Sequence, residues 1–305
     1  MALRSNSRPI SVASFPEIFT EKNRNENNGF LREFEELKDV GNGQSKKDAE
    51  LPANAAKNRY PHILPYDHSR VKLTIKDGDL NSGYINANYI TGFHGVNEYI
   101  STQAPTQASL VDFWRMIWEH KVRNIVMLTV CKEKGKVLCD QYWPSDSASY
   151  GPFTVICVSN LSYSDWTIRH FNLHHIEGSK VRTVCQMHYT AWPDHGVPKT
   201  PESLITFAEL VREQVQSLND SGPTVVHCSA GVGRSGTFIA LDVALQQLCS
   251  DLCIDIFKTV YTMRLNRYLM LQTLEQYIFV HRCIFEKNLQ KRKNPTVWTC
   301  HANRN

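Results

Sequence analysis

The stretch TVVHCSAGVGRSGTFIALD, residues 224–242, decides how the rest of the sequence is interpreted. It begins as an apolar run that ends in Cys228, continues through a turn with two glycines, and becomes a helical pattern at Ser235. We therefore expect a buried strand that delivers the cysteine to the edge of a sheet, and a helix directly after the turn. Gly231 and Gly233 allow the turn to curl so that its backbone amides point inward.

This turn predicts a reactive site. Its amides and the N-terminus of the following helix would form an anion-binding hollow with the sulfur of Cys228 at the floor. Such surroundings favour the thiolate, and the planar fork of Arg234 matches two oxygens of a phosphate. We predict that Cys228 attacks a bound phosphoryl group, that Arg234 binds this group, and that Ser235 donates its hydroxyl to the sulfur. The phosphate-binding residues would be Ser229, Ala230, Gly231, Val232, Gly233 and Arg234.

Two alternatives accompany this interpretation. A cysteine beside a glycine-containing turn is most often a buried structural residue, and only its combination with Arg234, Ser235 and a strand-to-helix context favours a nucleophile. His227 either orients the turn through hydrogen bonds or is an ordinary packed strand histidine, and a role as general base is less favoured.

A departing ester oxygen needs a proton, which neither a thiolate nor a guanidinium supplies. The segment TAWPDHGVP, residues 190–198, has the composition of a hinged surface loop, with Trp192 as an anchor and Gly196 as a point of bending. We predict that Asp194 is the general acid and later the base that activates water, and that loop closure carries it to the phosphate. An aspartate in such a loop usually only forms a turn, and its partnership with Cys228 favours the catalytic interpretation.

Composition argues against several other classes of protein. The 305 residues carry 34 basic and 30 acidic side chains, a net charge of +4, without the concentrated basic face of a nucleic-acid binder. No run reaches the roughly 18 apolar residues of a membrane span, and the N-terminus lacks the apolar region of a secretory signal. Nine scattered cysteines without a CxxC pair argue against zinc and thioredoxin-type sites. We expect reduced thiols, no metal and no cofactor.

Apolar periodicity divides the chain into three parts. Residues 1–28 are expected to form a flexible or loosely docked lead, 29–288 the catalytic domain, and 289–305 a basic flexible tail. Strands are predicted at 83–90, 98–102, 124–130, 153–158, 183–192 and 224–228, and helices at 30–40, 107–121, 202–218, 236–252 and 271–290. This order predicts an α/β (α+β) fold, with a highly twisted mixed sheet flanked by helices.

Beyond these patterns, the chain resembles the protein tyrosine phosphatases from about residue 30 to residue 286. Seven segments occur in the order of that family: KNRYPHILPYDHSRV (57–71), YINANYI (84–90), DFWRMIWE (112–119), QYWP (141–144), WPDHGVP (192–198), VHCSAGVGRSG (226–236) and LQTLEQY (271–277). The chain looks most like the intracellular catalytic domains of single-domain receptor-type (subgroup III) tyrosine phosphatases. The resemblance implies their cysteine-phosphatase fold.

The resemblance also assigns further residues to the site. Tyr60 would stack on the aromatic ring of the substrate and wall a cleft so deep that only an aryl phosphate reaches Cys228. Gln272 would orient the hydrolytic water with the assistance of Gln276, and Glu133 would fix the arginine of the loop.

Four positions depart from the family pattern. His62, two residues after the stacking tyrosine, stands where an aspartate or asparagine usually holds the substrate backbone, and it is the expected substrate contact here. Ala104 replaces the glycine of a QGP segment, Leu138 replaces a basic residue before Cys139, and Leu271 stands where valine is commoner. The changes at His62 and Leu138 bear on peptide affinity and on closure of the acid loop, while the thiol, the arginine and the acid are retained.

Motifs and resemblance together predict a protein tyrosine phosphatase that acts on phosphotyrosine-containing proteins through a cysteinyl-phosphate intermediate. Oxyanions such as phosphate and vanadate are expected to inhibit it. Two alternatives stay open: a phosphoinositide phosphatase on the same fold, and a weakly active phosphotyrosine-binding module. No nucleic-acid partner is expected, and membrane contact only through an anchor upstream of this chain. We expect a cytoplasmic location, either as a short soluble form or as the intracellular part of a single-pass membrane receptor.

Overall fold

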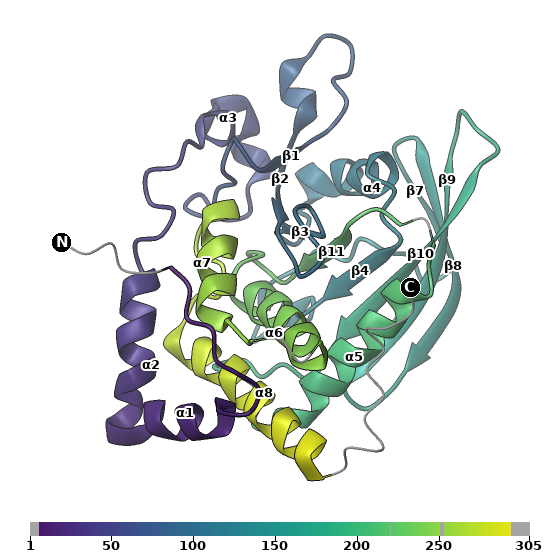
Figure 1. Ribbon diagram of the computed structural model, residues 1–305. Coiled ribbons are helices and arrows are strands. Elements are labelled where there is room, and N and C mark those ends of the chain that lie inside the picture. Colours follow the sequence, from purple (N-terminus) through teal and green to yellow (C-terminus); the bar gives the residue numbers. More distant parts are fainter. Residues whose placement is uncertain (1–5, 220, 251–252, 294–305) are drawn as a thin grey trace.

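Nine strands form one mixed sheet in the computed structural model, which describes residues 6–219, 221–250 and 253–293 (Figure 1). In chain order these strands are β1 (Arg70–Lys72), β2 (Tyr84–Ile90), β3 (Tyr99–Thr102), β4 (Asn124–Met127), β7 (Ser147–Tyr150), β8 (Phe153–Ser162), β9 (Trp166–His175), β10 (Val181–Tyr189) and β11 (Thr224–His227). Their order in the sheet is β1-β2-β3-β11-β4-β10-β9-β8-β7. Two short strands, β5 (Lys132–Glu133) and β6 (Lys136–Val137), pair in a separate hairpin.

Helices lie on both faces of this sheet. The α-helices are α1 (Phe15–Lys22), α2 (Arg24–Leu37), α3 (Lys47–Glu50), α4 (Leu110–Glu119), α5 (Glu202–Gln216), α6 (Gly233–Cys249), α7 (Ile256–Asn266) and α8 (Leu274–Lys293), and the 3-10 helices are η1 (Pro52–Lys57), η2 (Leu80–Gly83) and η3 (Gln107–Ser109). Helices α5 to α8 gather on one side of the sheet, and α4 covers the opposite side (Figure 1).

Adjacent residues of the central strands alternate between two apolar cores, as the two-residue period of a strand requires. Ile125 and Met127 of β4 and Val225 of β11 belong to the core on the α4 side. Val126 and Val226, one position along, belong to the core under α5, α6 and α8. The central strands are thus buried on both faces, which explains their continuous apolar runs.

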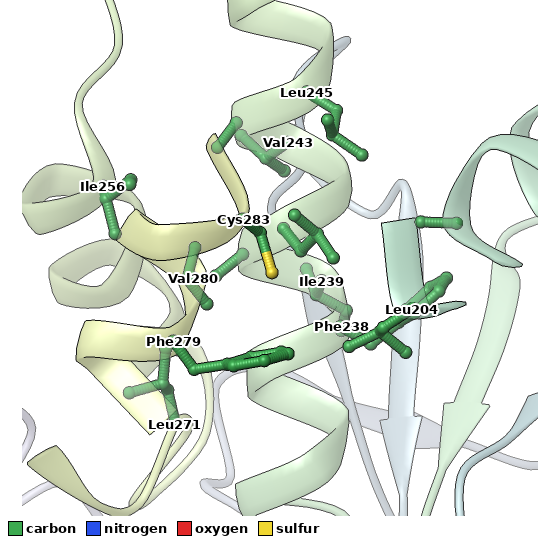
Figure 2. Close-up of a cluster of buried hydrophobic side chains, with 14 of the residues drawn as sticks. Leu204, Phe238, Ile239, Val243, Leu245, Ile256, Leu271, Phe279, Val280 and Cys283 are labelled. Atoms are coloured by element: carbon green, nitrogen blue, oxygen red, sulfur yellow. The ribbon is translucent and has the colours of Figure 1, made fainter. Parts of the chain in front are cut away.

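The second core is built around α6, which is apolar on nearly all sides and runs between α5 and α8. Figure 2 shows Phe279, Val280 and Cys283 of α8 facing Ile239 and Phe238 of α6. Cys283 is fully buried and serves here as a small apolar side chain. This packing fixes α6, whose first residue follows the cysteine turn.

The four central strands bring the predicted site together. β11 runs parallel to β3 and to β4, and β4 runs parallel to β10. Their carboxyl ends therefore meet at one edge of the sheet, where α/β proteins commonly bind ligands. Cys228 follows β11 at this edge, Thr129 follows β4, Ala104 follows β3, and the acid loop, residues 190–198, follows β10.

The fold agrees with the predicted twisted mixed sheet flanked by helices. All six predicted strands are present as β2, β3, β4, β8, β10 and β11, and the predicted helices correspond to α2, α4, α5, α6 and α8. Strands β1, β5, β6, β7 and β9 and helices α1, α3 and α7 were not predicted. In β9 only Thr167, Phe171 and Leu173 are buried, so polar side chains mask its alternation.

The N-terminal segment differs from the flexible lead expected for residues 1–28. Helix α1 and the start of α2 lie within it, and both pack against α8 (Figure 1). Phe15 is buried, and the rings of Phe19 and Phe285 stack with centroids 4.6 Å apart. Asn288 of α8 also donates to the carbonyl of Val12 at 2.7 Å. A few widely spaced aromatic residues, rather than a regular stripe, anchor this segment.

The other end of the chain also extends the fold. Helix α8 continues to Lys293, so the first residues of the predicted tail, 289–293, are helical. Basic residues in this last turn lie at the negative end of the helix dipole, which favours them there. The rest of the predicted tail, 294–305, lies outside the described residues. Within the described part of the chain, no helix is long and apolar enough to cross a membrane.

Candidate active site

Strand β11 delivers Cys228 to the edge of the sheet, and the chain turns from there into α6. All four residues of β11 are buried, and Cys228 itself is only 5% exposed. Residues 228–234, which we call the cysteine loop, curve around a hollow of about 210 Å³. The hollow is lined by Thr129, Glu133, Leu138, Cys228, Ser229, Ala230, Val232, Gly233, Arg234, Gln272 and Gln276.

The carbonyl groups of the cysteine loop bond to the scaffold. The carbonyl of Ser229 accepts a hydrogen bond from the N–H of Ala104 at 2.9 Å, and that of Val232 accepts one from the N–H of Leu271 at 3.0 Å. In a trans peptide the N–H points opposite to the C=O. Because these carbonyls are held outward, the amides that share their peptide planes are aimed at the hollow, where they can bind an anion.

A buried arginine binds the next two carbonyls of the loop, which lie between those of Ser229 and Val232. Arg267 donates from Nη2 to the carbonyl of Ala230 at 3.0 Å and from Nε to that of Gly231 at 2.9 Å. It also donates to the side-chain oxygens of Asn86 and Asn88, at 2.9 and 2.8 Å. Burial lowers the pKa of Arg267 to about 10, so the guanidinium stays charged at neutral pH. The shape of the hollow thus depends on a cation beneath the loop.

The sequence analysis did not identify Arg267. The only signal for it lies in β2, where Asn86 and Asn88 occur in a strand that is buried along most of its length. Buried amides need hydrogen-bond partners, so the two asparagines imply a polar partner from elsewhere in the chain. The sequence does not indicate which residue supplies it.

We expect Arg267→Met to weaken both the fold and the hollow. Several buried acceptors lose their donor at about 1–3 kcal/mol each, so the free energy of unfolding should fall by about 3 kcal/mol. The carbonyls of Ala230 and Gly231 are then free to rotate, and the affinity for inorganic phosphate should fall as well. Urea denaturation and isothermal titration with phosphate measure the two effects.

Arg115→Met is the matched control for this variant. Arg115 is equally buried, and it donates to the carbonyls of Ser82 at 2.8 Å and Thr74 at 2.6 Å, on the α4 side of the sheet. This control should lose stability and keep its phosphate affinity. If both variants kept their phosphate affinity, or lost it equally, Arg267 would have no special role in the hollow.

Gly231 meets a steric requirement of the loop. Its φ is +70°, a region that side chains with a Cβ rarely adopt. A Cβ at this position would lie 2.1 Å from the carbonyl oxygen of Thr102. Only glycine therefore allows the loop to lie against β3.

Arg234 connects the cysteine loop to the acid loop. Its Nη2 donates to the carbonyl of Pro193 at 3.2 Å and lies 3.9 Å from Oε1 of Glu133. Its guanidinium carbon also lies 5.8 Å from the ring centroid of Trp192. The indole N–H of Trp192 donates to the carbonyl of Gly196 at 3.2 Å, which closes the acid loop on itself. The guanidinium of Arg234, which can bind an anion in the hollow, is thus hydrogen-bonded directly to the acid loop.

Asp194 lies at the rim of the hollow, with its side chain 41% exposed. Its Oδ2 is 2.8 Å from Nζ of Lys134, a residue of the β5–β6 hairpin that the sequence analysis did not assign to the site. The hydrogen bond from Lys134, followed by that with Glu133, lowers the pKa of Asp194. Burial and the same hydrogen bond raise the pKa of Glu133. In this arrangement Asp194 favours its ionised form.

His227 is buried directly before the nucleophile candidate. Its Nδ1 donates to the carbonyl of Cys228 at 3.0 Å, and its Nε2 accepts from the hydroxyl of Tyr142 at 2.9 Å. Gln186 donates in turn to that hydroxyl at 2.7 Å, which fixes the direction of the chain of hydrogen bonds. Burial lowers the pKa of His227 to about 4, so the ring is neutral. This geometry suits a residue that orients the turn.

Ser235 and the two glutamines complete the inner part of the site. The hydroxyl of Ser235 is buried, and it has no hydrogen-bond partner within the described ranges 6–219, 221–250 and 253–293. Buried hydroxyls rarely stay unpaired, so its donor capacity is available to a neighbouring group. Gln272 and Gln276 line the hollow together, and Oε1 of Gln276 accepts from the N–H of Gln272 at 2.9 Å.

Residues 54–286 match the family model described as protein-tyrosine phosphatase. The chain belongs to the protein-tyrosine phosphatase family. Rat receptor-type tyrosine-protein phosphatase V is 50% identical to it over 285 residues, which cover 93% of this chain and 17% of that protein. Human receptor-type tyrosine-protein phosphatase eta is 45% identical over 281 residues, covering 92% of this chain and 21% of that protein. Human phosphatidylinositol phosphatase PTPRQ is 43% identical over 294 residues, covering 95% and 12%. The resemblance inferred from the motifs is confirmed.

The phosphatase domain thus corresponds to between 12% and 21% of the length of these relatives. The matched residues contain the cysteine loop, the acid loop and the segment with the two glutamines. They also contain the four departures from the family pattern.

Tyr60 contacts the cysteine loop through Ser229, a residue that lines the hollow. Its hydroxyl donates to Oγ of Ser229 at 2.8 Å, and Ser229 donates to the carbonyl of Leu138 at 2.7 Å. Nζ of Lys136 lies 5.8 Å from the centroid of the Tyr60 ring. His62 is exposed two residues farther along. Leu138 is among the residues that line the hollow, at the position where the family pattern has a basic residue.

Proposed function

We propose that this domain hydrolyses phosphotyrosine in proteins through a cysteinyl-phosphate intermediate. The observation that carries the proposal is the outward attachment of four successive carbonyls, from Ser229 to Val232. Their amides surround the space above the sulfur of Cys228, and Arg234 closes it with a positive charge. A phosphate dianion matches such a ring of donors better than the single oxyanion of an acyl transfer.

The first chemical step is attack of the Cys228 sulfur on phosphorus. The S–P bond forms while the bond from phosphorus to the tyrosine oxygen breaks, and Asp194 gives that oxygen its proton. Arg234 and the loop amides stabilise the charge on the equatorial oxygens. Because Arg234 also bonds to the carbonyl of Pro193, an oxyanion that repositions it acts directly on the acid loop.

The second step is hydrolysis of the thiophosphate. Gln272, with Gln276, holds a water in line with the S–P bond, and Asp194 now takes a proton from that water. The S–P bond breaks, and the thiolate leaves with the phosphate as product. The unpaired hydroxyl of Ser235 donates to the departing sulfur and stabilises it. His227 holds the carbonyl of Cys228 throughout both steps.

The depth of the hollow supports phosphotyrosine as the substrate class. Cys228 is nearly buried in the hollow, and Tyr60 is hydrogen-bonded to Ser229, a residue that lines it. An aryl phosphate is long enough to reach the sulfur and presents a flat ring that Tyr60 can contact. A phosphoserine is too short for both contacts. His62 is exposed two residues from Tyr60 and would contact the backbone of a bound peptide.

Phosphate release from three substrates tests this proposal. A phosphotyrosine peptide should exceed its phosphoserine counterpart by at least about 100-fold in kcat/KM, the scale on which a shaped pocket discriminates. A soluble phosphoinositide is the third substrate, because one relative is named a phosphatidylinositol phosphatase. Preference for the phosphoinositide would replace the proposed substrate class, and tight peptide binding without turnover would reduce the domain to a binding module.

The pH profile provides a second test, through Lys134. Its hydrogen bond favours the ionised form of Asp194, so Lys134→Met should raise the pKa of this carboxyl. A general acid acts only in its protonated form, and the alkaline limb of the kcat profile should therefore move to higher pH. Lys136→Met is the control, since that lysine lies over Tyr60 in the same hairpin. If the alkaline limb stayed unchanged in Lys134→Met, this would contradict the assignment of Asp194 as the general acid.

We further infer that the chain is the intracellular part of a membrane receptor. Relatives named receptor-type tyrosine-protein phosphatases match almost all of it, while the chain spans only a small part of their length. Tagging the complete gene product at both ends and fractionating cells tests this inference. Recovery of the domain in the membrane fraction supports it, and recovery only in the cytosolic fraction contradicts it.

A further inference from the structure

Two cysteines close the base of the β5–β6 hairpin at the rim of the active site. Cys131 precedes β5, and Cys139 follows shortly after β6. The N–H groups of Leu138 and Cys139 both donate to the carbonyl of Cys131, at 2.9 and 3.2 Å. The two ends of the hairpin are therefore tied together at this point. The thiol of Cys139 donates to the carbonyl of Asp140 at 3.3 Å, and neither cysteine is in a disulfide.

The environments of the two thiols are different. Cys131 is half-buried, and the charge of the Arg169 guanidinium acts on its thiol. The hydrogen bond from Cys139, and then the charge of Arg169, lowers the pKa of Cys131. Cys139 is 1% exposed, and its hydrogen bond to Cys131, together with burial, raises its pKa. Cys131 is accordingly the more acidic thiol of the pair.

Arg169 is held firmly in this position. Its Nη1 donates to the side-chain oxygen of Gln186 at 2.9 Å, and its guanidinium carbon lies 4.9 Å from the centroid of the Trp143 ring. A charged guanidinium that acts on a partly accessible thiol, with a second cysteine joined to it through a backbone hydrogen bond, is typical of cysteines that react with peroxide. These residues lie outside the hollow around Cys228, and the catalytic steps proposed above do not use them.

We propose that Cys131 and Cys139 form an oxidisable dithiol that takes hydrogen peroxide as its substrate and closes to a disulfide across the base of the hairpin. The Cys131 thiolate attacks one peroxide oxygen, the O–O bond breaks, and a sulfenic acid and hydroxide form. Cys139 then attacks the sulfenic sulfur, and its proton leaves with the hydroxyl group as water. The hydroxide takes up the proton that Cys131 lost on ionising, so in total two thiols and one hydrogen peroxide give one disulfide and two waters.

A disulfide at this position would act on residues at the rim of the hollow. The hairpin between the two cysteines carries Lys134, which bonds to Asp194, and Glu133, which lies beside Arg234. Oxidation of the pair would therefore act on the groups that hold the acid, and it would spare the nucleophile itself. Because it is a property of these two thiols, it holds or fails independently of the proposed phosphatase activity.

Peptide mapping of peroxide-treated protein tests the proposal. The full chain carrying Cys228→Ser is used, since this removes the catalytic thiol as a competing target. After graded hydrogen peroxide, free thiols are blocked with iodoacetamide and the protein is cut with trypsin and Asp-N. The sequence places Cys131 in peptide 124–132, Cys139 in 137–139, and Cys157 in a separate peptide. We expect a linked species of 124–132 with 137–139 that dithiothreitol reverses, at lower peroxide than oxidation of any other thiol.

Two variants make the result specific. Cys139→Ser should stop the reaction at the sulfenic acid, so that dimedone labels Cys131. Cys157→Ser removes another half-buried thiol on the Arg169 side and should leave the linked species unchanged. A link from Cys131 to Cys157, or Cys131 that stays open to iodoacetamide while other thiols oxidise, would overturn the proposal.

Discussion

Replacing Cys228 with serine is expected to abolish phosphotyrosine hydrolysis while leaving the anion hollow in place. Removal of a covalent nucleophile from a hydrolase costs on the order of 10⁵-fold or more in kcat. Serine keeps the shape of the side chain, but its hydroxyl is not ionised by the loop amides at neutral pH, so it does not attack phosphorus. Steady-state release of phosphate from a phosphotyrosine peptide measures the loss. The variant should still bind that peptide, because Arg234 and the loop carbonyls keep their partners.

Cys157→Ser is the matched control for this experiment. It removes a thiol from β8, at the far side of the sheet, and should retain turnover. Substantial phosphatase activity in Cys228→Ser would show that another group performs the attack. Loss of turnover together with loss of peptide binding and of the unfolding transition would show a folding defect, and a Cys228→Ala variant with intact folding would then repeat the test.

The second largest effect is expected for Asp194→Ala. Removing a general acid lowers kcat by about 10²–10⁴-fold, whereas peptide binding does not require the carboxylate. The variant should therefore hold phosphotyrosine proteins without releasing them as product. Stopped-flow and steady-state measurements of kcat and KM separate the two effects, and a pull-down from cell lysate identifies the bound phosphoproteins.

The leaving group provides an internal check on this second prediction. Tyrosine is a poor leaving group that needs a proton, while 4-nitrophenol leaves as an anion. The loss in Asp194→Ala should therefore be much greater for phosphotyrosine than for 4-nitrophenyl phosphate. His195→Ala changes the neighbouring residue of the same loop and should affect both substrates little. An equal loss on both substrates would mean that Asp194 positions the loop and does not transfer a proton.

Local chemistry made the cysteine loop predictable from the sequence. The apolar run before Cys228, the two glycines and the helix after Ser235 lie together, and each follows from a short-range rule. In the structure, Cys228, Gly233 and Arg234 line one hollow. The acid loop was equally visible, because its prolines, glycine and anchoring tryptophan all occur within residues 190–198.

The residues that hold the site residues in place could not be predicted from the sequence, because they act through contacts between distant segments. Arg267 follows α7 and donates to the carbonyls of the cysteine loop. The residues around Arg267 in the sequence do not indicate this role. Lys134 bonds to Asp194 only because the short hairpin folds over the rim. The N-terminal helix was missed for the same reason, since Phe15 is buried by α8 and not by its own neighbours.

Trapping the phosphorylated enzyme tests the central claim most directly. Gln272→Ala should slow hydrolysis of the intermediate more than its formation, so that it accumulates during turnover of a phosphotyrosine peptide. After rapid acid quenching and digestion with trypsin, Cys228 lies in peptide 213–234 together with His227. We predict that this peptide gains one phosphate and that fragmentation places it on the sulfur of Cys228. Phosphate on His227, or an unmodified peptide while the enzyme turns over, would contradict the account.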